Sequence, residues 1–158
     1  MAIDVGQALA ALPLAVWMRR VTWAYPVVET LHIVGLACLV GSIAVVDLRI
    51  LGWSKALPAD DLMRHVLPLS IAAFGLVVAS GLMLFLAHAG DLIGNRVFLV
   101  KMGLIGAAGV NAALFHTGSW ARPATWNDVA PLPARVIAAA SLLIWVAVIT
   151  CGRWIAYA

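Results

Sequence analysis

The strongest constraint on this chain is a succession of four apolar stretches, each long enough to cross a lipid bilayer. They cover roughly residues 24–47, 62–89, 97–117 and 134–157. A membrane-spanning helix needs about 20 mostly apolar residues, and in lipid only helices and closed barrels satisfy all their backbone hydrogen bonds internally. The pattern therefore predicts an all-α integral membrane four-helix bundle that forms a single membrane domain over residues 1–158.

Composition supports a membrane protein and argues against other classes. Of the 158 residues, 65% are hydrophobic and 11% are charged, whereas a soluble domain is about half apolar and about a quarter charged. The net charge of +3 comes without a basic run interleaved with aromatics, so no nucleic-acid partner is expected. The lipid bilayer is the expected surrounding.

The N-terminal segment is predicted to lie on the membrane rather than to cross it. Residues 2–18 are apolar but short, contain Pro13, and are followed by Arg19 and Arg20. A helix of this kind, with tryptophan and arginine near its end, is typical of the membrane interface. We expect one interfacial amphipathic helix here.

The links between the spans are short, which places consecutive spans side by side and antiparallel. Small residues recur at every fourth position of the third span, at Gly103, Ala107 and Asn111. Such a stripe allows close helix packing in lipid, and a flat cofactor needs the same small residues. Asn111 is expected either to form an interhelical hydrogen bond or to contact a cofactor.

Four histidines lie inside or at the edge of the spans, at His32, His65, His88 and His116. Ionisable or metal-binding side chains are costly at membrane depth, so they indicate a functional site. We call the end of the bundle where the first span begins the first end, and the opposite end the second end. His65 and His116 are predicted near the second end, and His32 and His88 in the half near the first end.

Two histidines at equal depth on different helices are what haem ligation by two imidazoles requires. His65 and His116 match well in predicted depth. His32 and His88 differ by about 9 Å at 1.5 Å of rise per residue. The sequence thus favours one or two haem b groups, with the four histidines as metal ligands. Histidines near span ends can equally be interfacial residues without a ligand.

Other polar side chains have candidate roles near these histidines. Glu29 precedes His32 by one helical turn and could orient its imidazole or bind a metal itself. Arg64, next to His65, suits a haem propionate or a lipid phosphate. Lys101 is expected to extend towards the first end, to neutralise a propionate or to pair with Glu29.

The first span is expected to end at Asp47, Leu48 and Arg49, with an interfacial ion pair at the second end. This interpretation gives Asp47 no part in a binding site.

Three classes of function fit these residues. The first is a b-type cytochrome, a quinol-linked oxidoreductase that carries electrons between a membrane quinol and a redox partner protein. The second is a copper or other metal-ion transporter or binding protein. Its path would be lined by residues that include soft ligands suited to Cu(I), namely Glu29, His32, Cys38, Met83 and Met102. The third is a non-catalytic membrane subunit. No nucleotide-binding or hydrolase motif is present.

The stretches TWAYPVVETLHIVGLACLVGSIAVVDLRILG and FLVKMGLIGAAGVNAALFH, with the N-terminal ALPLAVWMRR, resemble a bacterial family of small four-span membrane proteins. The family is similar, more distantly, to the membrane domain of CopD-type copper-resistance proteins and to four-helix dihaem cytochromes b. The resemblance implies a multi-pass protein of the bacterial inner membrane whose histidines face a haem or a copper ion.

Overall fold

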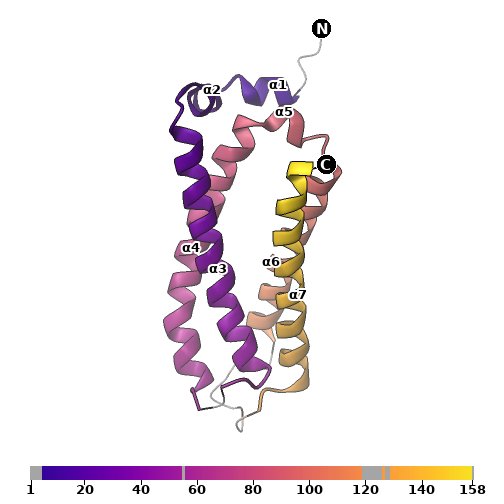
Figure 1. The fold of residues 1–158 in the computed structure, drawn as a ribbon. Helices are drawn as coiled ribbons and strands as arrows, with labels where there is room; N and C mark the ends of the chain where they lie inside the picture. The colour runs from indigo at the N-terminus through magenta and orange to yellow at the C-terminus, as the bar shows by residue number, and fades with distance from the viewer. Residues whose placement is uncertain (1–4, 55, 119–125, 127–128, 158) are drawn as a thin grey trace.

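The computed structural model describes residues 5–54, 56–118, 126 and 129–157. This part of the chain is almost entirely helical and contains no strand. Four long helices form an antiparallel bundle (Figure 1), and all four are long and apolar enough to cross a membrane. The predicted fold class is therefore confirmed, and the chain is a multi-pass membrane protein.

The four long helices are α3 (Ala24–Ile50), α4 (Ala59–Ala87), α6 (Arg96–Thr117) and α7 (Leu132–Trp154). Each is apolar around most of its circumference, as expected where lipid rather than water surrounds a helix. A 3₁₀ turn, η2 (Ile155–Tyr157), extends α7. The start of α6 is capped by Asn95, whose side-chain oxygen accepts hydrogen bonds from the backbone N–H groups of Val97 and Phe98.

The N-terminal segment forms two short helices rather than the single helix expected. These are α1 (Val5–Ala10) and α2 (Pro13–Arg20). Pro13 starts α2, where its missing N–H costs nothing because the first N–H groups of a helix have no partner. With α5 (Ala89–Leu92), these helices lie across the first end of the bundle (Figure 1). The Arg19 guanidinium ties them to α4 by donating to the carbonyl of Ala87 over 3.1 Å.

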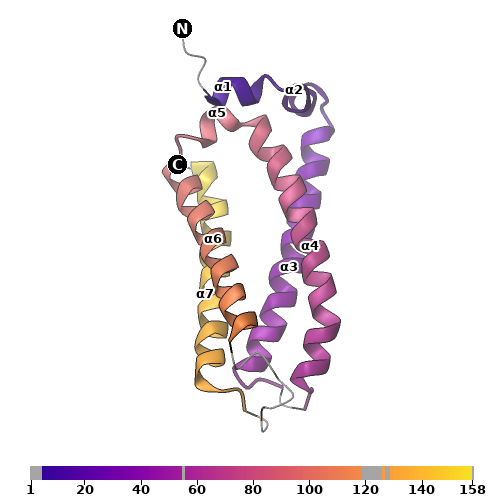
Figure 2. The same cartoon turned by 180° about the vertical axis from the view of Figure 1, so that it is seen from behind.

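The long helices associate as two hairpins. α3 packs closely along α4, and α6 packs along α7, while α3 and α7 join the hairpins to each other. By contrast, α4 and α6 make few close backbone contacts in the described part of the chain, although Phe85 and Phe98 stack between them with ring centroids 5.5 Å apart. The two helices stand apart when the bundle is seen from behind (Figure 2). The two hairpins therefore pack against each other mainly through α3 and α7 and much less through α4 and α6.

The contact between α3 and α4 depends on a glycine. A Cβ added at Gly35 would lie 3.1 Å from Cγ2 of Val77 and 3.2 Å from Cγ of Leu76, closer than the 3.5–4.0 Å (about) of an ordinary contact between carbons. Hydroxyl groups also join these helices, because Oγ of Ser42 and Oγ of Ser70 lie 2.7 Å apart. Small side chains and local hydrogen bonds thus hold the first hairpin together.

Candidate functional site

A cavity of about 420 Å³ lies between the four long helices in the half of the bundle near the second end. Its walls are mostly apolar and come from α3, α4, α6 and α7. The volume falls in the range of about 300–1,000 Å³ that is typical of small-molecule sites. Five polar side chains interrupt the apolar wall: Asp47, Ser70, Asn111, His116 and Ser141.

Asp47 is the most unusual of these groups. It lies on α3 and is only 7% exposed. Ser141 on α7 lines the same cavity, and Oδ2 of Asp47 has no hydrogen-bond partner among the described residues. A buried polar atom without a partner costs free energy, so this oxygen calls for an explanation.

The first span was expected to end at Asp47, Leu48 and Arg49, with these residues at the surface of the second end. α3 continues to Ile50, and both Asp47 and Arg49 are buried. Nε of Arg49 donates to the carbonyl of Leu57 over 2.6 Å, in the link between α3 and α4. The apolar residues Leu48, Ile50 and Leu51 that follow Asp47 were the signal that the carboxylate sits within the span.

Asn111 lies on α6 and joins the second hairpin. Its Nδ2 donates to the carbonyl of Ile137 on α7 over 3.2 Å. This is the interhelical hydrogen bond that the sequence offered as one of two roles. The side chain also lies on the cavity wall, where it could contact a bound cofactor, which is the second role expected from the sequence.

His116 lies one residue before the end of α6 and also lines the cavity. Its ring is exposed, contacts the edge of Phe115, and has Nδ1 2.8 Å from the carbonyl oxygen of Ala112. Because a carbonyl can only accept a hydrogen bond, Nδ1 carries the proton. In a neutral imidazole, Nε2 then has a free lone pair.

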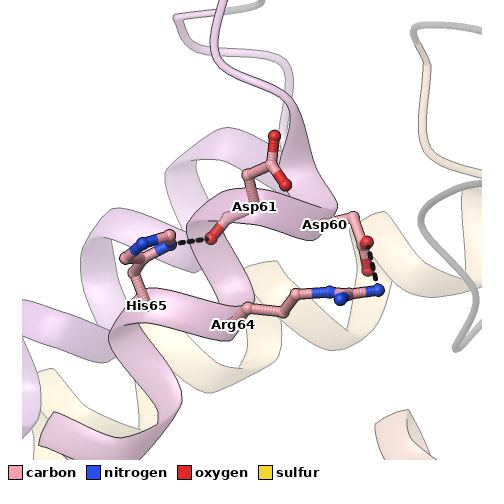
Figure 3. A network of polar contacts seen from close by, with 4 residues as sticks. All are labelled: Asp60, Asp61, Arg64 and His65. Carbon is pink, nitrogen blue, oxygen red and sulfur yellow. Dashed lines mark hydrogen bonds and ion pairs between the residues drawn. The ribbon is translucent and has the colours of Figure 1, made fainter.

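His65 has the same arrangement on α4. Its Nδ1 lies 2.8 Å from the carbonyl oxygen of Asp61 (Figure 3), so Nε2 is again the nitrogen with the free lone pair. The ring is exposed and does not line the cavity. The neighbouring Arg64 forms an ion pair with Asp60 at 3.0 Å, and 76% of its side chain is exposed.

His32 is half-buried between α3 and α4. Its Nδ1 lies 3.0 Å from Oγ of Ser80, and that hydroxyl donates to the carbonyl of Leu76 over 2.6 Å. The single hydroxyl proton is therefore used, so His32 donates from Nδ1. The ring rests on Gly81, where an added Cβ would lie 3.0 Å from Cε1 of the imidazole.

His88 lies elsewhere, at the junction of α4 and α5. Its ring meets the ring of Tyr25 edge to face, with centroids 5.3 Å apart. Tyr25 precedes His32 by seven residues on α3, which is roughly 10 Å of helical rise. The structure therefore does not bring His32 and His88 to the same depth.

Glu29 and Lys101 are not brought together either. Glu29 is exposed on α3. Lys101 lies against α7, with Nζ 3.6 Å from the position of a Cβ on Gly152. No ion pair joins the two among the described residues. That part of the chain also holds no group of three or more His, Cys, Asp or Glu side chains placed to bind a metal ion.

Fold and site together define a small multi-pass membrane protein with a mostly apolar cavity between its four long helices. The chain belongs to a family of unknown function, DUF6644, whose model matches residues 21–158. No curated protein and no solved structure matches the chain.

Proposed function

We propose that this protein is a b-type cytochrome that holds one haem between His65 and His116. Electrons would pass between a membrane quinol and a partner protein at the surface. A haem iron with two imidazole ligands supplies one-electron transfer. The chain would supply the two ligands, the apolar surroundings and the place where a quinol meets the haem.

The observation that carries this proposal is the matched hydrogen bonding of the two histidines. Each has Nδ1 fixed by the carbonyl four residues earlier, at 2.8 Å in both cases. Metal-ligating histidines almost always donate their second ring N–H in this way, which fixes the ring and leaves the other nitrogen for the metal. Both rings are exposed, so a ligand could reach Nε2.

The arrangement of the helices agrees with a flat cofactor at this place. His65 lies near the start of α4 and His116 near the end of α6, and both helix ends are at the second end of the bundle (Figure 2). These are the two helices that make few close backbone contacts. Arg64, largely exposed beside His65, could reach a propionate.

The proposal is for one haem rather than two. His32 has its ring against Ser80 and Gly81, whereas His88 faces Tyr25 about 10 Å further towards the first end. Two histidines that would hold the same metal ion must lie close together, and His32 and His88 do not. The distant similarity to dihaem cytochromes b and a location in a bacterial inner membrane are parts of the same proposal.

The test is the optical spectrum of detergent-purified protein, oxidised and then reduced with dithionite, with a pyridine haemochrome assay. We expect one haem per chain in the wild type, and its loss in His65→Ala and in His116→Ala. His88→Ala is the matched control and should keep the haem. A colourless protein, expressed with haem available, would refute the proposal, and copper found by elemental analysis would favour the metal-transport alternative.

A further inference from the structure

The cavity and the oxygen without a partner point to a second ligand. We propose that the cavity binds a neutral quinol whose hydroxyl group donates a hydrogen bond to Oδ2 of Asp47. Only the transfer of electrons from the bound quinol to a haem rests on the proposed function. Binding itself depends on the cavity and can be tested whether or not a haem is present.

Asp47 offers a buried acceptor atom to a ligand. Its Oδ2 is buried and unpaired among the described residues. Both Asp47 and Ser141 line the cavity. A hydroxyl donor placed in the cavity would satisfy the oxygen and remove the cost of burying it alone.

The rest of the cavity wall is mostly apolar. The side chains that line the cavity around Asp47 are mainly Leu, Ile, Val, Phe and Ala. Such a wall binds an apolar body and leaves the few polar groups to orient it. The ligand should therefore be a largely apolar molecule with one or two hydroxyl groups. Charged molecules would have to give up their hydration in this wall, at high cost.

Exposed residues of α4 and α6 lie on the cavity wall and indicate how a ligand would enter. The cavity is lined on α4 by Leu67 and Phe74, which are 46% and 48% exposed, and on α6 by Ala112, which is also exposed. Because α4 and α6 make few close backbone contacts and carry these exposed lining residues, we infer that the cavity is entered between them. In a membrane this opening faces lipid, so the ligand would enter from the bilayer. Quinols are lipid-soluble molecules with hydroxyl donors and match all three requirements.

The same cavity places the quinol beside the proposed haem. His116 lines the wall together with Asp47 and Asn111. A quinol bound to Asp47 would lie next to the imidazole that ligates the iron. Asp47 is thus a substrate-binding residue in this proposal.

The experiment is isothermal titration of detergent-purified, dithionite-reduced protein with decylubiquinol. We expect saturable binding to the wild type and an affinity lower by about tenfold in Asp47→Leu, because the hydrogen bond to Oδ2 is lost. Asp47→Asn keeps the shape and should bind with intermediate affinity. Asp91→Asn removes an exposed carboxylate at the opposite end of the bundle, away from the cavity, and should bind like the wild type.

Quenching of Trp145 fluorescence locates the ligand, since Trp145 lines the cavity. Binding that quenches the wild type but not Trp145→Phe supports the site. Equal affinities of the wild type, Asp47→Leu and Asp47→Asn would overturn the proposal, and so would an absence of saturable binding because phospholipid fills the cavity. Haem content is measured on the same samples. Binding without haem refutes the cytochrome alone, and haem without Asp47-dependent binding refutes the quinol site alone.

Discussion

The close contact between α3 and α4 at Gly35 gives a prediction whose magnitude follows from the structure. Replacing Gly35 by alanine adds a Cβ 3.1 Å from Cγ2 of Val77 and 3.2 Å from Cγ and Cδ2 of Leu76. Val77 is β-branched and stiff at χ1, and Cγ of Leu76 lies close to its own backbone. Neither neighbour can simply swing away, so the helices must separate by a few tenths of an ångström.

Overpacking of this kind costs about 1–3 kcal/mol. Replacing a helical glycine by alanine also gains roughly 0.5–1 kcal/mol of helix stability. The matched control is Gly41→Ala on the same helix, where an added Cβ meets nothing within 4 Å. This gain in helix stability is common to both variants and cancels when their free energies of unfolding are compared. We therefore expect Gly35→Ala to be less stable than Gly41→Ala by about 1–3 kcal/mol.

The assay is equilibrium unfolding in mixed micelles with increasing sodium dodecyl sulfate, followed by tryptophan fluorescence. Free energies of unfolding are compared for the wild type and the two variants. Gly41→Ala should be as stable as the wild type or slightly more stable. Equal unfolding free energies for Gly35→Ala and Gly41→Ala would refute the close packing of α3 on α4 at this position.

Three further predictions concern single polar contacts and use the same unfolding assay. Asn95→Ala should lower the free energy of unfolding by about 1 kcal/mol, because α6 loses its N-cap; no change would mean that water replaces the cap. Asn111→Ala should lower the free energy of unfolding by about 0.5–1.5 kcal/mol, because the hydrogen bond to the carbonyl of Ile137 is lost. An unchanged free energy of unfolding would mean that this hydrogen bond does not stabilise the folded protein. Arg64→Ala should change the free energy of unfolding by less than about 0.5 kcal/mol, because its ion pair with Asp60 is solvent-exposed. A larger decrease would contradict this and mean that Arg64 makes a stabilising contact with a buried group.

The helices and their antiparallel order could be predicted from the sequence because lipid leaves few alternatives. Four apolar stretches of sufficient length must be helices, and short links make consecutive helices neighbours. The break before Pro13 was also visible as a proline in the middle of the N-terminal segment. The segment nevertheless forms two helices rather than the one expected, because a proline favours the first turn of a new helix over the interior of an existing one.

The facing directions of the polar side chains could not be predicted. A helix that is apolar all round carries no periodic signal that fixes its rotation in the bundle. The separation of His32 from His88 was visible as a mismatch in depth, but the contacts of His32 with Ser80 and of His88 with Tyr25 depend on tertiary packing. The burial of Asp47 was missed although the apolar residues after it indicated that the helix continues.

The division of the bundle into two hairpins has a consequence for linkage. The first hairpin contributes Asp47 to the cavity, and the second contributes Asn111, His116 and Ser141. The binding site therefore exists only when the hairpins are docked, so any ligand that bridges them favours the docked state by mass action. A ligand present at about a hundred times its dissociation constant would add roughly 2.7 kcal/mol to docking. Occupancy of the cavity and assembly of this membrane protein are thus one coupled equilibrium.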